Sequence, residues 1–206
     1  AEATYVSRTP RVSWRTGAAS EASPVSDFYR LIFRRKLSQS GERTLTPAVV
    51  PPRFSHIDSC ISIVFQDLNE LIAFAGATMS LPFDFYIKST GKADFRSEII
   101  NSLPRQIFGK SNDLVALRVL LLNCLTEEFG DLWRQMWRDA FESDQWCSKS
   151  PMLSRQHFAA LSADWGANVP LRTDFSRRQA LLEIDVLAAM ALGISIDELL
   201  MIYRVQ

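Results

Sequence analysis

A short polar segment between two apolar stretches carries residue types that bind anions. In Lys88-Ser-Thr-Gly91-Lys92 two cations flank two hydroxyl side chains and a glycine, directly after an aromatic cluster. A glycine permits a positive φ and a close approach of the backbone to a ligand. Cations and hydroxyls bind phosphate oxygens or the edges of bases. The segment also fits a polar turn between buried segments, and the sequence leaves both interpretations open.

Further cations lie before and after this segment. Arg34, Arg35 and Lys36 are consecutive, and Arg43 follows them. Each could neutralise a phosphate and release condensed counterions, which makes binding depend on salt. Taken singly, each also fits a solvated surface charge. The candidate nucleic-acid-binding residues are Arg34, Arg35, Lys36, Arg43, Lys88, Gly91, Lys92 and Arg96.

The charge of the chain is balanced overall but uneven along its length. The 206 residues include 23 Lys and Arg against 23 Asp and Glu. Residues 1–110 hold 14 basic and 10 acidic side chains, and residues 111–206 hold 9 and 13. Zero net charge argues against a dedicated nucleic-acid binder, yet such an asymmetry can place a cationic surface on one side. Differences of this size also arise by chance.

Catalytic and metal-binding motifs are missing from the sequence. There is no glycine-rich phosphate loop, no HExxH and no GxSxG. His56 and His157 lie about a hundred residues apart, and Cys60, Cys124 and Cys147 form no CxxC pair. We therefore expect no catalytic residue, no metal and no cofactor in this chain. The cysteine usage and the lack of a long apolar stretch favour a cytoplasmic protein without a membrane partner.

Two acidic residues interrupt an apolar helical pattern near the C-terminus. Glu183 and Asp185 are two positions apart and point to different faces of a helix, so they do not form a shared acid–base pair. We expect one of them to pair with Arg177 or Arg178.

The first half of the sequence predicts a mixture of strands and helices. Residues 1–26 fit a flexible or extended arm, and a helical spacing of apolar residues predicts a helix over residues 27–37. Strands are predicted over residues 44–50 and 57–65, where β-branched residues are frequent. Asp67 is placed to cap a helix that runs from Leu68 to Met79.

The second half of the sequence predicts helices. One helix covers residues 113–123, and a second follows Thr126; residues 143–172 are irregular. Ser176 has the spacing of a capping box and begins a helix that ends before Gly193. Ser195 and Glu198 form another capping box, which opens a last helix. That helix stops without a stop signal, so we expect the chain to be part of a longer protein.

These elements predict an α+β fold, with a small mixed or antiparallel sheet packed on helices and a mainly helical C-terminal part. The expected organisation is an arm over residues 1–26, an α+β DNA-recognition part over residues 27–110, and a helical part over residues 111–206 packed on the same core.

Three segments, in order, carry a resemblance to one family. They are Tyr29-Arg-Leu-Ile-Phe-Arg34 with Glu42-Arg-Thr-Leu-Thr-Pro-Ala-Val-Val-Pro-Pro52; Met79-Ser-Leu-Pro-Phe-Asp-Phe-Tyr-Ile-Lys-Ser-Thr-Gly-Lys92 with Ser102-Leu-Pro104; and Arg177-Arg-Gln-Ala-Leu-Leu-Glu-Ile-Asp185 with Leu192-Gly-Ile and Tyr203-Arg. They resemble the target-recognition regions of large adenine-specific DNA methyltransferases of type IIG restriction–modification and related phage-defence systems.

The resemblance implies a module that reads double-stranded DNA for a methyltransferase catalytic domain in the same or a partner chain. The catalytic Asn/Asp-Pro-Pro-aromatic motif of such enzymes is missing, because Val50 precedes Pro51-Pro52 and Arg53 follows it. S-adenosylmethionine is therefore expected only in a parent catalytic domain, and this chain alone is expected to be non-catalytic. The family's arginine in the second segment is replaced by Tyr86 or Ile87, which leaves Lys88 and Lys92 as its cations.

A protein–protein scaffold of a larger bacterial assembly is the alternative. It would dock through the acidic helical half, and Trp133 with Trp137, or Ile202 with Tyr203, would then be exposed.

Overall fold

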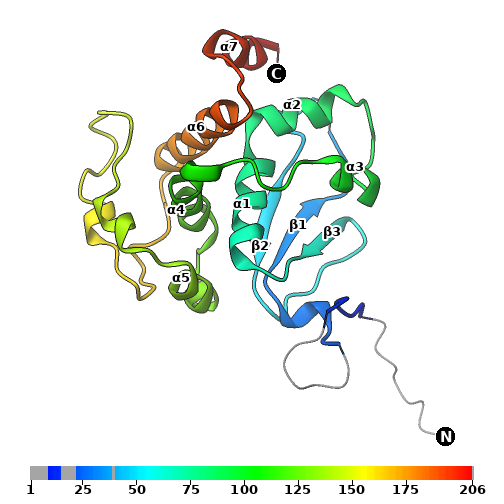
Figure 1. The fold of residues 1–206 in the computed structure, drawn as a ribbon. Helices are drawn as coiled ribbons and strands as arrows, with labels where there is room; N and C mark the ends of the chain where they lie inside the picture. The colour runs from blue at the N-terminus through cyan, green and yellow to red at the C-terminus, as the bar shows by residue number, and fades with distance from the viewer. Residues whose placement is uncertain (1–8, 15–21, 39, 206) are drawn as a thin grey trace, which may run out of the picture.

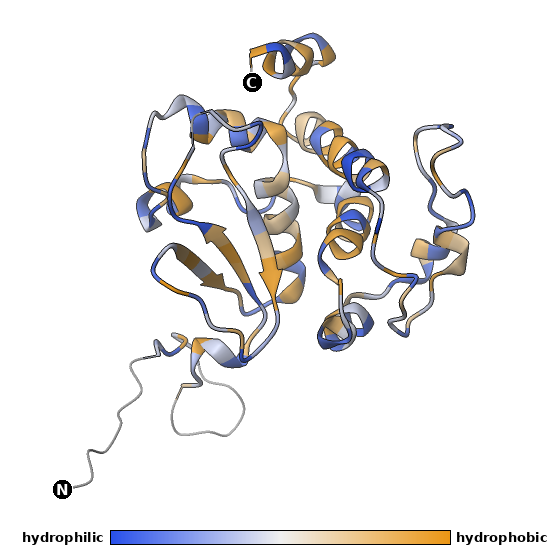
Figure 2. Ribbon diagram, turned by 180° about the vertical axis from the view of Figure 1, so that it is seen from behind, coloured by the Kyte–Doolittle hydropathy of each residue, from blue (hydrophilic) through white to orange (hydrophobic). Residues whose placement is uncertain are grey.

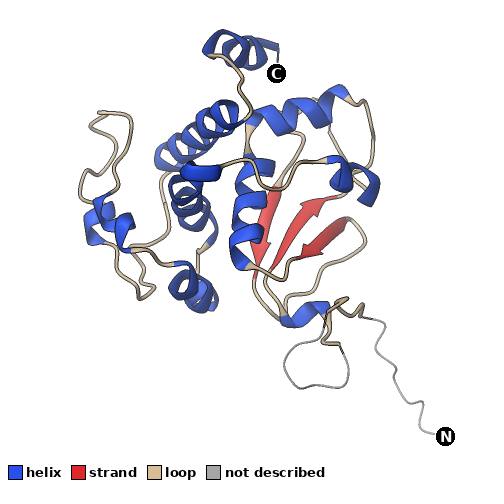
Figure 3. Ribbon diagram, in the orientation of Figure 1, coloured by secondary structure: helices blue, strands red, loops and turns tan. Residues whose placement is uncertain are grey.

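The computed structural model describes residues 9–14, 22–38 and 40–205, whose arrangement is shown in Figure 1. A small antiparallel sheet has helices packed on one face, and further helices make up most of the C-terminal part (Figure 3). This is the α+β fold expected from the sequence. None of the helices in the described ranges is both long and apolar enough to cross a membrane.

The sheet consists, within the described residues, of three short strands. They are β1 (Arg30–Arg34), β2 (Pro47–Val50) and β3 (Cys60–Val64). β1 is central and antiparallel to both neighbours, so the order is β2-β1-β3. Leu31 and Phe33 point into the core and are 0% and 1% exposed. Because side chains alternate along a strand, Arg30, Ile32 and Arg34 lie on the outer face of the sheet.

The prediction of a helix over residues 27–37 is wrong. Phe28, Leu31 and Ile32 have a helical spacing, but the only helical turn here is η1 (Val25–Asp27), and β1 follows it. A strand at this place forms ladder hydrogen bonds with partners on both sides, which a helix could not do. Tertiary pairing therefore outweighs the local pattern.

The other two predicted strands are present but shorter than expected. β2 begins at Pro47 rather than at residue 44. The backbone N–H groups of Thr44 and Leu45 donate to Oδ1 of the buried Asp84 at 2.8 and 2.5 Å. They are thus bound by a carboxylate of the helix Leu81–Ser89 and do not extend the ladder.

Three helices follow the sheet in sequence. They are α1 (Leu68–Met79), α2 (Leu81–Ser89) and α3 (Ser97–Ser102). The expected cap of α1 is confirmed, because Asp67 accepts a hydrogen bond from Asn69 N at 2.9 Å. α1 lies against β1 and β2 on the inner face of the sheet (Figure 1). α2 was not predicted; it begins directly after the extended Ser80 and carries Pro82 in its first turn.

The predicted helices of the second half are present. They are α4 (Asn112–Asn123), α5 (Gly130–Met136), α6 (Asp174–Ala191) and α7 (Ile196–Val205). Short 3-10 turns connect them: η2 (Gly109–Ser111), η3 (Glu127–Phe129), η4 (Asp139–Ser143) and η5 (Phe158–Ala160). Residues 143–172 are otherwise irregular, as expected. Apolar residues line α4, which packs against α1 and α6 (Figure 2).

Capping residues mark where the last two helices begin and where α6 ends. α6 begins three residues earlier than a cap at Ser176 would place it, because Thr173 is its N-cap and accepts from Ser176 N at 3.2 Å. Gly193 has a φ of 71°, the left-handed conformation expected after a helix. The predicted box at α7 is confirmed: Ser195 N donates to Glu198 at 2.7 Å, and Glu198 N donates to Ser195 Oγ at 3.3 Å.

A continuous hydrophobic core joins the two halves of the chain. It includes Leu31 of β1, Phe74 of α1, Leu120 of α4 and Ile184 of α6, all at most 1% exposed. The same core encloses Trp133, which is fully buried.

Much of the predicted N-terminal arm, at residues 1–8 and 15–21, lies outside the described residues. The described parts pair with one another: Val12 N donates to Ser23 O at 3.0 Å, and Val25 N donates to Pro10 O at 2.9 Å. Val12 is 5% exposed, so this region contributes to the packed structure.

Glu183 and Asp185 lie on different sides of α6, but the prediction of their partners is wrong. Glu183 accepts from Arg118 Nε of α4 at 2.8 Å, and Asp185 forms an ion pair with Arg43 at 2.7 Å. Both acids are buried, whereas Arg178 binds Asp174 and Glu42 near the surface. Both sides of α6 that carry these acids are covered by other parts of the chain, so the acids pair with Arg118 and Arg43 and not with Arg178.

Candidate nucleic-acid interface

Two candidate segments meet at the end of β1. The chain beyond β1 pairs with residues 93–95: Phe95 N donates to Arg35 O at 2.7 Å, and Leu37 N donates to Ala93 O at 2.9 Å. An antiparallel bridge joins Lys36 and Asp94. The fold therefore brings the cations after β1 next to the polar segment after α2, although they are far apart in sequence.

We call the described cations gathered here the basic rim. They are Arg34, Arg35, Lys36, Lys92 and Arg96. The side chains of Lys36 and Arg96 are 74% and 59% exposed, and Arg34 and Lys92 are exposed as well. Arg34 Nε donates to Lys36 O at 2.8 Å, which fixes its direction along the end of the strand. The rim presents several cations to solvent at one edge of the molecule.

Two carboxylates lie within the basic rim. Asp58 pairs with Arg35 at 2.6 Å, and Asp94 pairs with Lys36 at 2.7 Å and Arg96 at 3.1 Å. Hydrogen bonds from Lys36 and then from Arg96 hold the pKa of Asp94 below its ordinary value. Asp58 is exposed, and exposed ion pairs contribute little free energy, so Arg35 can exchange this carboxylate for a phosphate. The side chain of Asp94 is only 18% exposed.

The turn after α2 contains Gly91, the glycine of the polar segment described in the sequence analysis. Gly91 has a φ of 63°, and no atom lies within 4 Å of the position that a Cβ would occupy. Lys88, in the last turn of α2, donates from Nζ to Gly41 O at 3.2 Å and is half-buried. Lys88 therefore fastens the residue 40–43 loop to α2, whereas the exposed Gly91 and Lys92 remain on the surface.

The structure does not bring Arg43 to the basic rim. Its guanidinium forms two hydrogen bonds with Asp185, at 2.7 and 3.1 Å, and another with Met79 O at 2.8 Å. Asp185 also accepts from Leu81 N at 2.6 Å and from the Tyr203 hydroxyl. Arg43 thus ties its loop to α1 and α6, and its side chain is 20% exposed.

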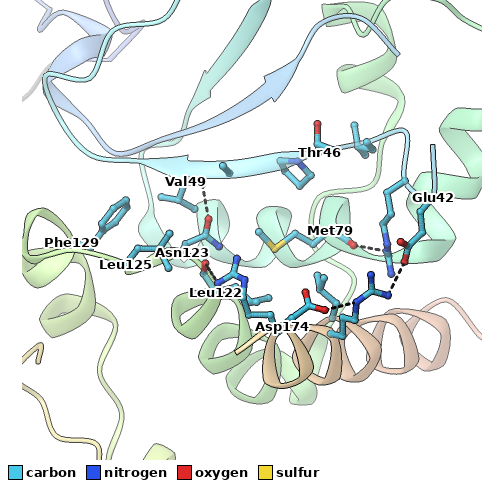
Figure 4. A pocket seen from close by; sticks show the side chains of 16 residues that line it. Glu42, Thr46, Val49, Met79, Leu122, Asn123, Leu125, Phe129 and Asp174 are labelled. Carbon is cyan, nitrogen blue, oxygen red and sulfur yellow. Dashed lines mark hydrogen bonds and ion pairs between the residues drawn. The ribbon is translucent and has the colours of Figure 1, made fainter. Parts of the chain in front are cut away.

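A cleft lies between β2 and α6 (Figure 4). It has a volume of about 620 Å³. Its lining includes Arg43, Arg177, Arg178, Glu42, Asp174 and Asn123 among the polar residues, and Met79, Leu122, Leu125 and Phe129 among the apolar ones.

The charged groups of this cleft are bound by its own walls. Arg177 donates to Leu122 O and Leu171 O, both at 3.3 Å. Arg178 pairs with Asp174 at 3.2 Å and with Glu42 at 3.6 Å (Figure 4). Groups that already have partners lose those partners when a ligand binds. Arg177 is thus held by backbone carbonyls, whereas the ion pairs of Arg178 with Glu42 and Asp174 are exposed.

The two histidines have different environments. His157 is half-buried, its ring stacks on Trp146 with centroids 6.4 Å apart, and its Nε2 has no hydrogen-bond partner. Burial lowers the pKa of His157. His56 is exposed, and its Nε2 lies 2.9 Å from Ser62 Oγ, a contact that the sequence did not predict. Burial raises the pKa of the Cys124 thiol above its ordinary value, which makes a reactive thiolate there unfavourable.

One cation near the candidate residues was missed. Arg30 is 4% exposed and lies four positions before Arg34 on the same face of β1. The alternation of Arg30, Ile32 and Arg34 is the signal that could have found it, but it is visible only once residues 30–34 are assigned to a strand.

Comparisons with known proteins identify no relative. No family model, no curated protein and no solved structure matches the chain. The described residues also contain no group of three or more His, Cys, Asp or Glu side chains that could hold a metal ion.

Proposed function

We propose that this chain is the DNA target-recognition module of an N6-adenine DNA methyltransferase of a restriction–modification or phage-defence system, and that it is non-catalytic alone. The observation that carries the proposal is the basic rim, where two segments that resemble such modules lie side by side. S-adenosylmethionine and the catalytic motif belong to a methyltransferase domain in the same or a partner chain.

The basic rim has the properties that duplex DNA requires of a binding surface. Its cations lie at one edge of the sheet on the strand end and the turn, so they can follow a phosphate backbone. Gly91 allows that turn to approach a groove closely. Phosphate contacts by these cations release counterions, so we expect binding to weaken steeply with salt.

Charge reversal tests this role. In the rim variant, Arg34→Glu, Arg35→Glu and Lys92→Glu change exposed or half-exposed cations. The matched control carries Arg134→Glu, Lys149→Glu and Arg155→Glu, exposed cations of the helical half that change the net charge equally. We expect the rim variant to bind a labelled duplex of mixed sequence roughly tenfold more weakly or worse, by fluorescence anisotropy, and the control to bind nearly as wild type. Equal loss in both variants would contradict the proposal.

A scaffold function is the second candidate, and exposed apolar side chains favour it. Leu182, Val186 and Met190 are spaced along the outer face of α6, and Met190 is 69% exposed. Ile196 of α7 is 64% exposed. The tryptophans expected at such an interface lie elsewhere: Trp133 is fully buried and Trp137 is half-buried, whereas Ile202 is half-buried and Tyr203 is 40% exposed.

Solution mass separates the two candidates. A scaffold surface on α6 would give a concentration-dependent increase in mass without DNA, or capture of a partner, that Met190→Lys abolishes. A recognition module would increase in mass only when duplex DNA is added, and Met190→Lys would leave its DNA affinity unchanged. Light scattering with and without duplex measures both.

A further inference from the structure

The outer face of the sheet contains a buried cation that has no counter-ion among residues 9–14, 22–38 and 40–205. Arg30 is 4% exposed; its Nη1 donates to Ser62 Oγ at 3.4 Å and its Nη2 donates to the Phe54 carbonyl. Its Nε is buried and has no partner. No carboxylate of the described residues lies within ion-pair distance of this guanidinium. Most of its donor capacity is therefore unused.

Two other arginines of the described residues with little-exposed side chains, Arg118 and Arg43, do have counter-ions. Arg118 is 2% exposed and binds both Asp144 and Glu183, and the half-buried Arg43 binds Asp185. These carboxylates raise the pKa of Arg118 and of Arg43 against the opposing effect of burial. For Arg30, burial alone acts, and it lowers the pKa. A buried charge is normally paired, so Arg30 lacks a partner that its environment calls for.

A pocket of about 440 Å³ opens beside Arg30 (residues of β1, β3 and the loop before β3). Its lining is rich in hydroxyl groups: Thr9, Ser26, Ser55 and Ser62 all contribute, together with His56. The described residues that line it include no Asp or Glu. The pocket is therefore positive in charge and supplied with neutral hydrogen-bond donors.

Ser62 and His56 lie in contact with each other in the lining of this pocket. A carbonyl can only accept, so the 3.1 Å contact with Ile57 O places a proton on His56 Nδ1. His56 Nε2 lies 2.9 Å from Ser62 Oγ, and Ser62 Oγ also accepts from Arg30 Nη1 at 3.4 Å. These contacts hold His56, Ser62 and the guanidinium together at the lining of the pocket.

We propose that this pocket is a phosphate-binding site, in which the oxyanion is the missing counter-ion of Arg30 and the surrounding hydroxyls bind its remaining oxygens. A guanidinium matches phosphate geometry through parallel N–H groups. A tetrahedral group with several acceptor oxygens also suits donors that approach from more than one wall. The phosphate belongs either to a soluble phosphate ester or to a nucleic-acid backbone.

Inorganic phosphate is the direct probe. A ligand that binds only the folded state stabilises it, so the melting temperature should rise saturably with phosphate relative to chloride at equal ionic strength. Phosphorus NMR should show line broadening of the same ligand. Absence of both effects in the wild-type chain overturns the proposal.

Variants locate the site. Arg30→Met keeps a similar length of side chain, and we expect phosphate binding to weaken roughly tenfold or more, because a charge-assisted contact is lost. The variant should also melt higher than wild type without phosphate, since it removes an uncompensated buried charge. Arg155→Met, an exposed cation elsewhere, should retain the wild-type shift. An equal phosphate shift in Arg30→Met and Arg155→Met overturns the proposal.

Smaller changes keep the test independent of whether Arg30→Met folds. Ser62→Ala and Ser55→Ala leave the guanidinium in place and should each weaken phosphate binding. Unchanged affinity in both, together with an unfolded Arg30→Met, would count against the site.

A competition experiment distinguishes the two sources of phosphate. If the group belongs to a DNA backbone, saturating duplex removes the phosphate signal and Ser62→Ala weakens DNA binding. If it belongs to a soluble ester, duplex leaves the signal unchanged and methyl phosphate replaces inorganic phosphate. The site does not depend on the DNA-recognition proposal, because the probe is free phosphate and the basic rim is not altered.

Discussion

Gly76 of α1 lies directly against side chains of α4. A Cβ built on it would lie 2.3 Å from Val115 Cγ1 and 3.2 Å from Val119 Cγ2. We expect Gly76→Ala to destabilise the fold by about 1–3 kcal/mol in urea denaturation, since overpacking outweighs the gain in helix propensity.

A second glycine provides the matched control for this prediction. Gly130, at the start of α5, has its nearest neighbour, Trp165 Cβ, at 3.8 Å from the built Cβ. Gly130→Ala should be neutral or slightly stabilising, because alanine restricts the unfolded chain without a clash. Equal effects of the two substitutions would show that the α1–α4 approach is looser than the structure indicates.

His157 gives the fold a dependence on pH. Burial lowers its pKa in the folded state, so below neutral pH the unfolded chain binds more protons than the folded one. Stability associated with His157 is thus present above its unfolded pKa and is lost as the pH falls.

We expect the urea midpoint of the wild type to fall between about pH 7 and pH 5.5 by more than that of His157→Phe, which keeps an aromatic ring against Trp146. Both proteins retain the same carboxylates, so the difference isolates this histidine. Parallel pH profiles would rule out its titration as a source of acid sensitivity.

The residues whose roles could be predicted from the sequence are those with local partners. Asp67, Gly193 and the Ser195–Glu198 box act within a few positions of themselves, so their spacing is sufficient. The partners of Glu183 and of Arg30 are set by packing between distant segments. Spacing carries no information about such contacts.

At the scale of elements, β2 is an edge strand, and a side chain from α4 binds one of its outward N–H groups. Asn123, at the end of α4, accepts from Val49 N at 2.9 Å and is 7% exposed. Pro47 removes another N–H from the strand. These two features leave the described edge with little donor capacity for a further strand.

Asn123→Ala should expose the role of this contact. A buried N–H without a partner costs about 1–3 kcal/mol, so we expect a loss of that size in urea denaturation. Amide hydrogen exchange at Val49 should accelerate, which a general loss of packing would not single out. Gln135→Ala, an exposed change on α5, serves as the control and should change stability by less than about 0.5 kcal/mol.

The segment that sequence analysis assigned wrongly forms a strand because neighbouring strands pair with it. Residues 30–34 have a helical apolar spacing, yet β2 and β3 bind them on both sides. The same error hid the shared face of Arg30 and Arg34. The candidate cations were therefore identified by type, but their grouping into the basic rim required the strand.

At the scale of the whole molecule, exposed cations and exposed apolar side chains lie on different elements. The basic rim lies at the end of β1 and on the turn after α2. α6 and α7 expose apolar residues such as Met190 and Met201, and α7 packs against α2. In the proposed function, the rim would contact DNA and these apolar residues would contact protein. The place of the rim in the first half of the chain agrees with the uneven charge of the two halves.

The most direct test of the proposed role is a salt titration of duplex binding, with the wild type and the rim variant measured side by side. Each phosphate contact contributes about 0.9 to the slope of log K against log salt concentration. If the basic rim binds DNA, the slope of the Arg34→Glu, Arg35→Glu, Lys92→Glu variant should be flatter by roughly 2 to 3. Equal slopes for the two proteins, or wild-type binding that does not depend on salt, would contradict a DNA-binding role for the basic rim.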